Sequence, residues 1–154
     1  MADSRLRVIA FESRRAVEMA ALIRKQGGEP FVAPSMREVP LAEQPAALSF
    51  ARALEAGAVD IVVCLTGVGT RALVEAVAPA LTRERLTTLL GRTTLVARGP
   101  KPVAALRELG LAPALIVPEP NTWRELLTAL DVGFAVAGKR VVVQEYGIEN
   151  PELL

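Results

Sequence analysis

Short, continuously apolar segments alternate with segments whose apolar residues recur at helical spacing along most of this 154-residue chain. Continuous apolar runs are typical of strands covered on both faces, and the spacing between them is typical of amphipathic helices. The predicted strands are 6–11, 30–33, 60–65, 93–97, 114–117 and 140–144, and the predicted helices are 16–26, 45–56, 68–77, 83–90, 102–109 and 122–130. This order predicts an α/β protein with an open parallel sheet flanked by helices.

Glycines and a proline mark the ends of several of these helices. Gly27 and Gly28 follow the first helix, Gly57 follows the second, and Gly110 follows the helix that opens at Pro102. Glycine after a helix and proline in its first turn are the usual boundary residues. The boundaries are therefore supported by residues outside the apolar pattern.

The last residues of the chain carry helix-start signals. Asn150 suits an N-cap, Pro151 suits the first helical position and Glu152 suits the first turn, yet the chain ends at Leu154. We therefore expect the chain to be a piece of a longer polypeptide, and we expect the missing C-terminal portion to be its partner.

Composition narrows the possible chemistry. The chain has 18 Lys and Arg against 17 Asp and Glu, one Cys and no His. The absence of His excludes Ser-His-Asp and Cys-His mechanisms and His-based zinc or haem sites, so no metal site is predicted. A near-zero net charge argues against a nucleic-acid partner, and no apolar run approaches the roughly 20 residues of a membrane span. A single cysteine favours a reducing cytoplasm.

Basic and small polar residues gather where the predicted strands end. In an open parallel sheet these ends lie at one edge, where helix N-termini present backbone amides to ligands. Five such junctions are predicted, at 12–15, 66–70, 98–101, 119–122 and 145–147. Free amides, a positive helix end and a nearby cation would together favour an anion.

The segment Gly67–Ala72 has the form Gly-x-Gly-x-x-Ala after a strand, which leaves three interpretations open. It fits a dinucleotide fingerprint, and Arg98 after the next strand would suit the 2′-phosphate of NADP. The two glycines also suit a tight strand-to-helix turn, or a backbone loop that contacts another anion. Cys64 lies inside the preceding apolar strand and is predicted to be a core residue.

Taken together, these loops resemble those of uroporphyrinogen-III synthase. The resemblance is carried by the opening strand and helix with Gly27, Gly28 and 30–34, by 64–69 with Val74, by 97–101 with Ala105, Leu106 and Gly110, by Thr122 with Leu126 and Leu127, and by 138–147. The chain departs from the family pattern in having Gly67 where Ser is more usual, Arg98 where a small residue is usual and Pro102 where Thr or Ala is usual.

The resemblance implies two similar α/β domains of flavodoxin-like type, joined by a two-stranded linker, with the active site in the cleft between them. Residues 1–37 would then supply the N-terminal βαβ elements of the first domain. Residues 38–154 would supply most of the second domain, which would be truncated at its C-terminus.

The implied reaction needs no cofactor. Hydroxymethylbilane would lose water and close to uroporphyrinogen III with inversion of its D ring. The implied substrate-binding residues are Ser13, Arg14, Arg15, Thr66, Gly67, Val68, Gly69, Arg98, Gly99, Lys101 and Thr122. No catalytic residue is assigned, although Tyr146 is a candidate for assisting departure of the hydroxyl group. Two alternatives remain: a non-catalytic tetrapyrrole or anion sensor, and a fragment of an NADP-binding oxidoreductase.

Overall fold

The computed structural model describes residues 5–35 and 45–145, which fall into two compact units. Unit 1 comprises Met1–Ala42 and unit 2 comprises Glu43–Leu154. The boundary expected between residues 37 and 38 and the expected helix start at Asn150 lie outside the described residues. Each unit is described by itself below.

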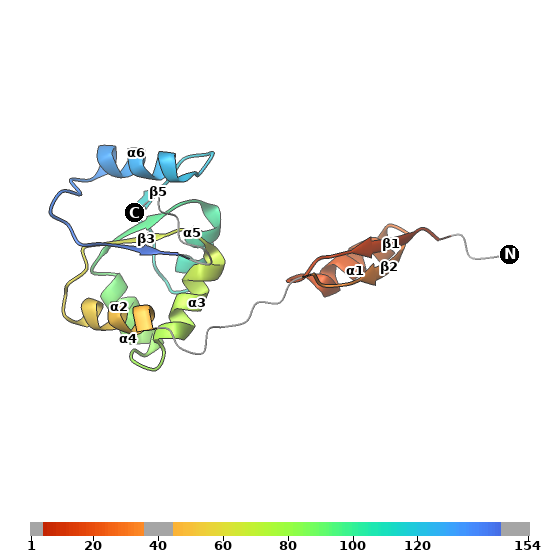
Figure 1. Cartoon of the computed structure of the whole chain (residues 1–154), viewed down its shortest axis with the longest axis horizontal. Coiled ribbons are helices and arrows are strands. Elements are labelled where there is room, and N and C mark those ends of the chain that lie inside the picture. The colour runs from red at the N-terminus through yellow and green to blue at the C-terminus, as the bar shows by residue number, and fades with distance from the viewer. Residues whose placement is uncertain (1–4, 36–44, 146–154) are drawn as a thin grey trace. The chain divides into compact units, whose positions relative to one another are not determined.

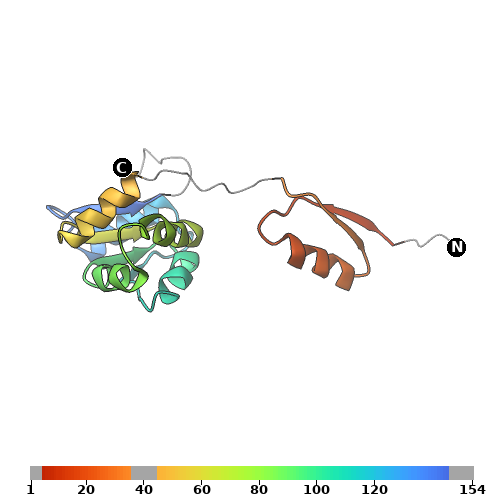
Figure 2. The same cartoon turned by 90° about the horizontal axis from the view of Figure 1, so that it is seen from below.

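Unit 1 is a single βαβ element. Strands β1 (Arg7–Ala10) and β2 (Glu29–Val32) pair in parallel, and helix α1 (Ala16–Lys25) connects them. The helix ends where Gly27 adopts a left-handed φ of 79°. Figure 2 shows α1 along one side of the strand pair, whereas Ile9 and Phe31 on the other side are 63% and 66% exposed. No residue of α1 is fully buried.

Unit 2 contains a four-stranded parallel sheet in the order β5-β4-β3-β6. Its strands are β3 (Ile61–Cys64), β4 (Thr94–Ala97), β5 (Leu115–Ile116) and β6 (Val141–Gln144). Its helices are α2 (Pro45–Glu55), α3 (Gly67–Val77), α4 (Arg83–Leu90), α5 (Pro100–Arg107) and α6 (Trp123–Gly133). Both sheets are parallel and carry helices, so the predicted α/β fold class is confirmed.

Alternate residues of β3 face two separate hydrophobic clusters. Val62 and Cys64 belong to the cluster formed with α2 to α5, and Ile61 and Val63 belong to the cluster formed with α6. Figure 1 shows α6 on one side of the sheet and α2 and α4 on the other. This two-sided burial explains the continuous apolar pattern of β3.

Cys64 is confirmed as a core residue. It is 2% exposed, and burial raises the pKa of its thiol to about 11. The thiol is therefore protonated at neutral pH and is a poor nucleophile.

All twelve predicted elements are present, with small shifts at some ends. Helix α5 begins at Pro100, two residues before the predicted start, because proline is tolerated in the first helical turn. Helix α6 continues to Gly133, three residues past the predicted end. Within the described residues, no helix is long and apolar enough to cross a membrane.

The order of the strands creates a switch point between β3 and β6. From β3 the chain runs outward to β4 and β5 on one side, and β6 then pairs with the opposite side of β3. Ligands of open parallel sheets bind beyond the carboxyl ends of the strands at such a point. In unit 2 this place is occupied by the turn 66–69, which is the N-cap and first turn of α3.

Two glycines seat the first turn of α3 against its neighbours. A Cβ on Gly67 would lie 2.6 Å from the carbonyl oxygen of Lys101 in α5. A Cβ on Gly69 would lie 2.0 Å from Nε2 of Gln144 at the end of β6. The glycine spacing that resembles a dinucleotide fingerprint is thus required here for packing against protein atoms.

The opposite end of the β3–β6 pair is fastened by an ion pair. The Asp60 carboxylate accepts hydrogen bonds from the backbone amide of Arg140 at 2.8 Å and from its Nε and Nη2 at 2.9 and 3.0 Å. Nη2 of Arg140 also donates to the carbonyl oxygen of Gly57 at 2.8 Å. These hydrogen bonds hold the pKa of Asp60 well below its usual range.

We predict that Asp60→Asn makes unit 2 less stable at neutral pH and less sensitive to acid. Folding favours the ionised carboxylate, so its contribution is present above the unfolded pKa of about 3.9 and is lost as the pH falls toward the lower folded pKa. Urea titrations between pH 7 and pH 2, followed by the fluorescence of Trp123 (the single tryptophan), measure this difference. Asp131→Asn, the same change on an exposed residue of α6, is the control. Parallel stability curves for Asp60→Asn and wild type would contradict the prediction.

We also predict that Gly69→Ala destabilises unit 2 by about 1–3 kcal/mol, because the added methyl group overlaps Gln144. Adding Gln144→Ala should recover part of that loss, since it empties the overlapped space. Gly133→Ala is the control, because a Cβ there comes no closer than 3.9 Å to a neighbouring atom. Additive effects of the two substitutions in a double-mutant cycle would contradict direct contact.

Candidate functional site

The N-terminus of α3 has two backbone amides without an acceptor among the described residues. Thr66 is the N-cap, and its Oγ1 accepts a hydrogen bond from the Gly69 amide at 2.9 Å. The next bond is made by the Thr70 amide, which donates to the carbonyl oxygen of Thr66 at 2.9 Å. The amides of Gly67 and Val68 have no acceptor within the described residues. A helix end of this kind favours an anion.

The N-terminus of α5 lies beside that of α3, because Gly67 packs directly on Lys101. Its N-cap is Gly99, which provides no side-chain cap, and Pro100 and Pro102 have no N–H to offer. The amide of Lys101 therefore remains available in the first turn. We call the amides of Gly67, Val68 and Lys101 the anion cradle.

Cations accompany the anion cradle. Lys101 is exposed and Arg98, in the turn between β4 and α5, is half-buried. Neither side chain has a hydrogen-bond or ion-pair partner in the part of the chain that the structure describes. Their positive charges add to the positive ends of the two helices.

Asn121 ties the turn after β4 to the loop after β5. With its amide oriented to satisfy both bonds, Asn121 donates to the carbonyl oxygens of Arg98 at 2.9 Å and Val117 at 2.8 Å. A Cβ on Gly99 would lie 2.9 Å from the side chain of Asn121, so glycine permits this approach. The predicted residues Arg98 and Gly99 are thereby fixed next to the loop that leads to Thr122.

The N-terminus of α6 is already occupied by a carboxylate of its own. The Thr122 amide donates to Oε2 of Glu125 at 2.9 Å, and the Thr122 hydroxyl donates to the same oxygen. These hydrogen bonds lower the pKa of Glu125. The expectation of free amides at 119–122 was wrong here, because a capping box satisfies the helix end.

The turn before α1 in unit 1 is occupied in the same way. Oε1 of Glu12 accepts hydrogen bonds from the amides of Arg14 at 2.9 Å and Arg15 at 3.1 Å, which lowers the pKa of Glu12. The expectation of free amides was wrong at this junction too. Ser13, Arg14 and Arg15 therefore offer side chains rather than these two amides, and the guanidinium of Arg15 also pairs with Glu18 at 3.5 Å.

The predicted site residues thus divide into three groups. Unit 2 brings together Thr66, Gly67, Val68, Gly69 and Lys101, and holds Arg98, Gly99 and Thr122 in the neighbouring turns. Unit 1 carries Ser13, Arg14 and Arg15. The candidate Tyr146 lies outside the described residues.

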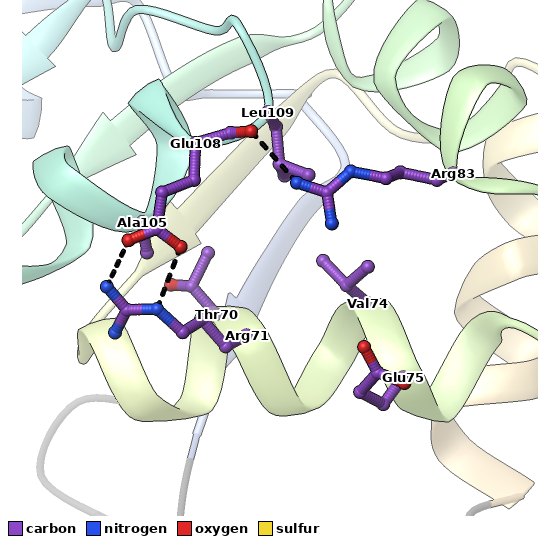
Figure 3. Close-up of a pocket in the computed structure, with 8 residues that line it drawn as sticks. All are labelled: Thr70, Arg71, Val74, Glu75, Arg83, Ala105, Glu108 and Leu109. Carbon is purple, nitrogen blue, oxygen red and sulfur yellow. Dashed lines mark hydrogen bonds and ion pairs between the residues drawn. The ribbon is translucent and has the colours of Figure 1, made fainter.

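An ion pair that the sequence did not reveal braces α3 against α5. Nε of Arg71 donates to Oε2 of Glu108 at 2.9 Å, and Nη2 donates to the second oxygen of that carboxylate. Nη2 of Arg83 in α4 donates to the carbonyl oxygen of Glu108 at 2.8 Å. Figure 3 shows these groups around a small pocket of about 140 Å³, with Glu75 at its side. Both positive and negative side chains line this pocket, and the ion pair between Arg71 and Glu108 holds the two helices together.

Gln144 is a second residue that sequence reasoning missed. Its side chain is 7% exposed, and its Oε1 lies 3.4 Å from the Thr66 amide and 3.5 Å from Oγ1 of Thr70. A polar residue that ends the run Val141–Val143 was the available signal. Gln144 therefore connects the end of β6 to the first turn of α3.

Comparisons with known proteins agree with this fold. A family model described as uroporphyrinogen-III synthase HemD matches residues 17–154. The chain is 31% identical over 148 residues to the Uncharacterized protein YjjA of Bacillus subtilis (strain 168), covering 96% of this chain and 54% of that protein.

Solved structures of uroporphyrinogen III synthase from the extremely thermophilic bacterium Thermus thermophilus are also similar. A mutant form has a TM-score of 0.67 at 34% identity, covering 96% of this chain and 55% of that one. The wild-type form has a TM-score of 0.57 at 34% identity and covers 54% of that chain. The chain thus spans about half the length of the relatives it matches. On its sequence and its fold, the chain belongs to the uroporphyrinogen-III synthase HemD family.

Proposed function

We propose that this chain serves uroporphyrinogen-III synthesis by binding hydroxymethylbilane, and that the anion cradle takes one of the substrate's carboxylates. The observation that carries the proposal is the pair of helix N-termini at the switch point, held side by side through Gly67 and Lys101, whose Gly67, Val68 and Lys101 amides have no acceptor among the described residues. Membership of the family supports the choice of substrate. Because the chain spans about half of its relatives, the complete activity is part of the proposal.

The remaining proposed substrate-binding residues contribute the groups that are not already hydrogen-bonded within the protein. Arg98 and Lys101 neutralise carboxylates near the anion cradle. Thr122 contributes to the wall of the site, because its hydroxyl and amide already serve Glu125. Ser13, Arg14 and Arg15 act through side chains.

The proposed reaction is a lyase reaction that closes the linear tetrapyrrole with loss of water and inversion of the D ring. It needs no cofactor. The contribution of this chain is mainly to hold a flexible polyanion in one closed shape, which lowers the entropic cost of ring closure. Tyr146 remains a candidate for assisting departure of the hydroxyl group.

We further propose that residues 1–37 and 38–154 belong to two domains, and that the C-terminal portion of a longer chain completes the first. The support lies in unit 1, where one side of a two-stranded sheet leaves Ile9 and Phe31 exposed at paired positions. A sheet this small is marginal by itself in water.

The single buried cysteine suits the reducing cytoplasm, which is our proposed location.

An isomer assay tests the proposed activity. Hydroxymethylbilane is generated in place, incubated with this chain, oxidised and resolved as uroporphyrin I or III. If this chain catalyses the proposed reaction, we expect isomer III in excess of a no-protein control. Binding of the tetrapyrrole with isomer I alone would instead favour the sensor interpretation for this piece, and absence of both binding and isomer III would contradict the proposal.

Lys101→Met provides the residue-level prediction. Removing the ammonium while keeping the stem should weaken uroporphyrin III binding by about tenfold at low salt and by less at high salt, because a charge-assisted contact contributes roughly 1.5 kcal/mol. Fluorescence titration of the bound porphyrin measures the Kd. Lys139→Met makes the same change before β6, at the opposite edge of the sheet, and should leave the Kd unchanged. Equal effects of the two variants would contradict a role for Lys101.

A separate prediction concerns the side of unit 1 on which Ile9 and Phe31 are exposed. Replacing Ile9 and Phe31 with serine should lower the fluorescence of the dye ANS bound to this chain, because it removes a contiguous apolar patch. Val132→Ser, on α6 in unit 2 at a position that is 85% exposed, is the control. A form extended to the length of the relatives should bind less ANS without substitution, and unchanged dye binding would contradict coverage by the added segment.

A further inference from the structure

We infer that Gln144 is a positioning residue, which holds the turn 66–69 so that the Gly67 and Val68 amides stay available to a bound carboxylate. This inference rests on the proposed function for the identity of the ligand. Its structural part, the hold on the turn, stands on the contacts of Gln144 alone.

Gln144 is a polar residue at a buried position, 7% exposed. It ends β6 in register with Cys64 of β3, on the side of the sheet that faces α3. It and Thr70 are the buried polar residues of the described chain. Leucine or methionine would suit such a position without carrying polar atoms out of water.

The side chain of Gln144 reaches the turn at several points. Its Oε1 lies within hydrogen-bond reach of the Thr66 amide and the Thr70 hydroxyl. Its Nε2 lies against Gly69, where the absence of a Cβ leaves it space. Thr66 Oγ1 is the next nearest group, at 2.8 Å from the same Cβ position. One side chain thus contacts the N-cap residue, the first turn and the glycine of α3.

Nε2 of Gln144 is also a donor without an acceptor. It is buried, and no hydrogen-bond partner faces it within the described residues. A buried unpartnered donor is unfavourable for folding, and native structures retain few of them. Packing alone therefore does not explain why residue 144 carries a side-chain amide. The acceptor oxygen of that group explains it, because Oε1 accepts a hydrogen bond from the Thr66 backbone amide and so fixes where the helix begins.

Gln144→Leu tests the inference, with Gln144→Met as the unbranched alternative should leucine fail to fold. Exchange of the Thr66 and Gly69 amides, which are the hydrogen-bonded amides of the turn, should accelerate about tenfold when measured by NMR, since roughly one hydrogen bond to the turn is lost. The Kd for uroporphyrin III should rise by a similar factor, while the Tm stays the same or rises. Gln144→Glu retains an acceptor oxygen and should keep the exchange rates close to those of wild type.

Leu54→Ala is the matched control for general loosening, because Leu54 is 4% exposed, lies on α2 and belongs to the hydrophobic cluster that includes Cys64, the register partner of Gln144. It should lower the Tm without a selective effect on the turn. Wild-type exchange rates in Gln144→Leu would overturn the inference. Failure of the wild-type chain to bind uroporphyrin III would contradict the proposed function instead, and the exchange measurement would still decide whether Gln144 holds the turn.

Discussion

The close contact made possible by Gly67 and Gly69 is the constraint on which the candidate site depends. Without side chains at these positions, the first turn of α3 lies on the carbonyl of Lys101 and on the amide group of Gln144. The contact aligns two helix N-termini at the switch point of the sheet. It also leaves the Gly67 and Val68 amides without an acceptor among the described residues, at a turn where a larger residue would displace the helix. Packing and ligand binding are here two consequences of the same small residues.

Helix ends in this chain differ in what already occupies them. Glu12 satisfies the start of α1 and Glu125 satisfies the start of α6, so each carries its own anion. At α5 the prolines remove two amides, and at α3 the Thr66 hydroxyl takes only the amide of Gly69. A foreign carboxylate therefore meets competition at α1 and α6 but not at α3. The strand-to-helix junctions look equivalent along the sequence, but they differ in whether a side chain of the protein already occupies the helix N-terminus.

Much of the fold could be predicted because its signals are local. The apolar run at 61–64 reflects two-sided burial, and the left-handed glycine after α1 marks a helix end within a few residues of its cause. The Thr122-x-x-Glu125 spacing is a local signal too, a capping box that the expectation of free amides at 119–122 overlooked. The contacts of Gln144 are not local, because its partners Thr66 and Thr70 precede it by 78 and 74 residues. Likewise, glycine spacing does not reveal whether the approaching group is a phosphate or a carbonyl of the protein.

The charges of the described site limit the part it plays in chemistry. A general acid at neutral pH needs a pKa near 7. The resolved shifts of Glu12, Asp60, Glu108 and Glu125 all lower the carboxyl pKa, so these groups are ionised and have no proton to donate. Burial has the opposite effect on Cys64, whose thiol keeps its proton too tightly to act as a base. Backbone amides and cations remain, and they bind anions without titrating. The described residues are therefore suited to holding and orienting a polyanion, and proton transfer would require a group other than these five.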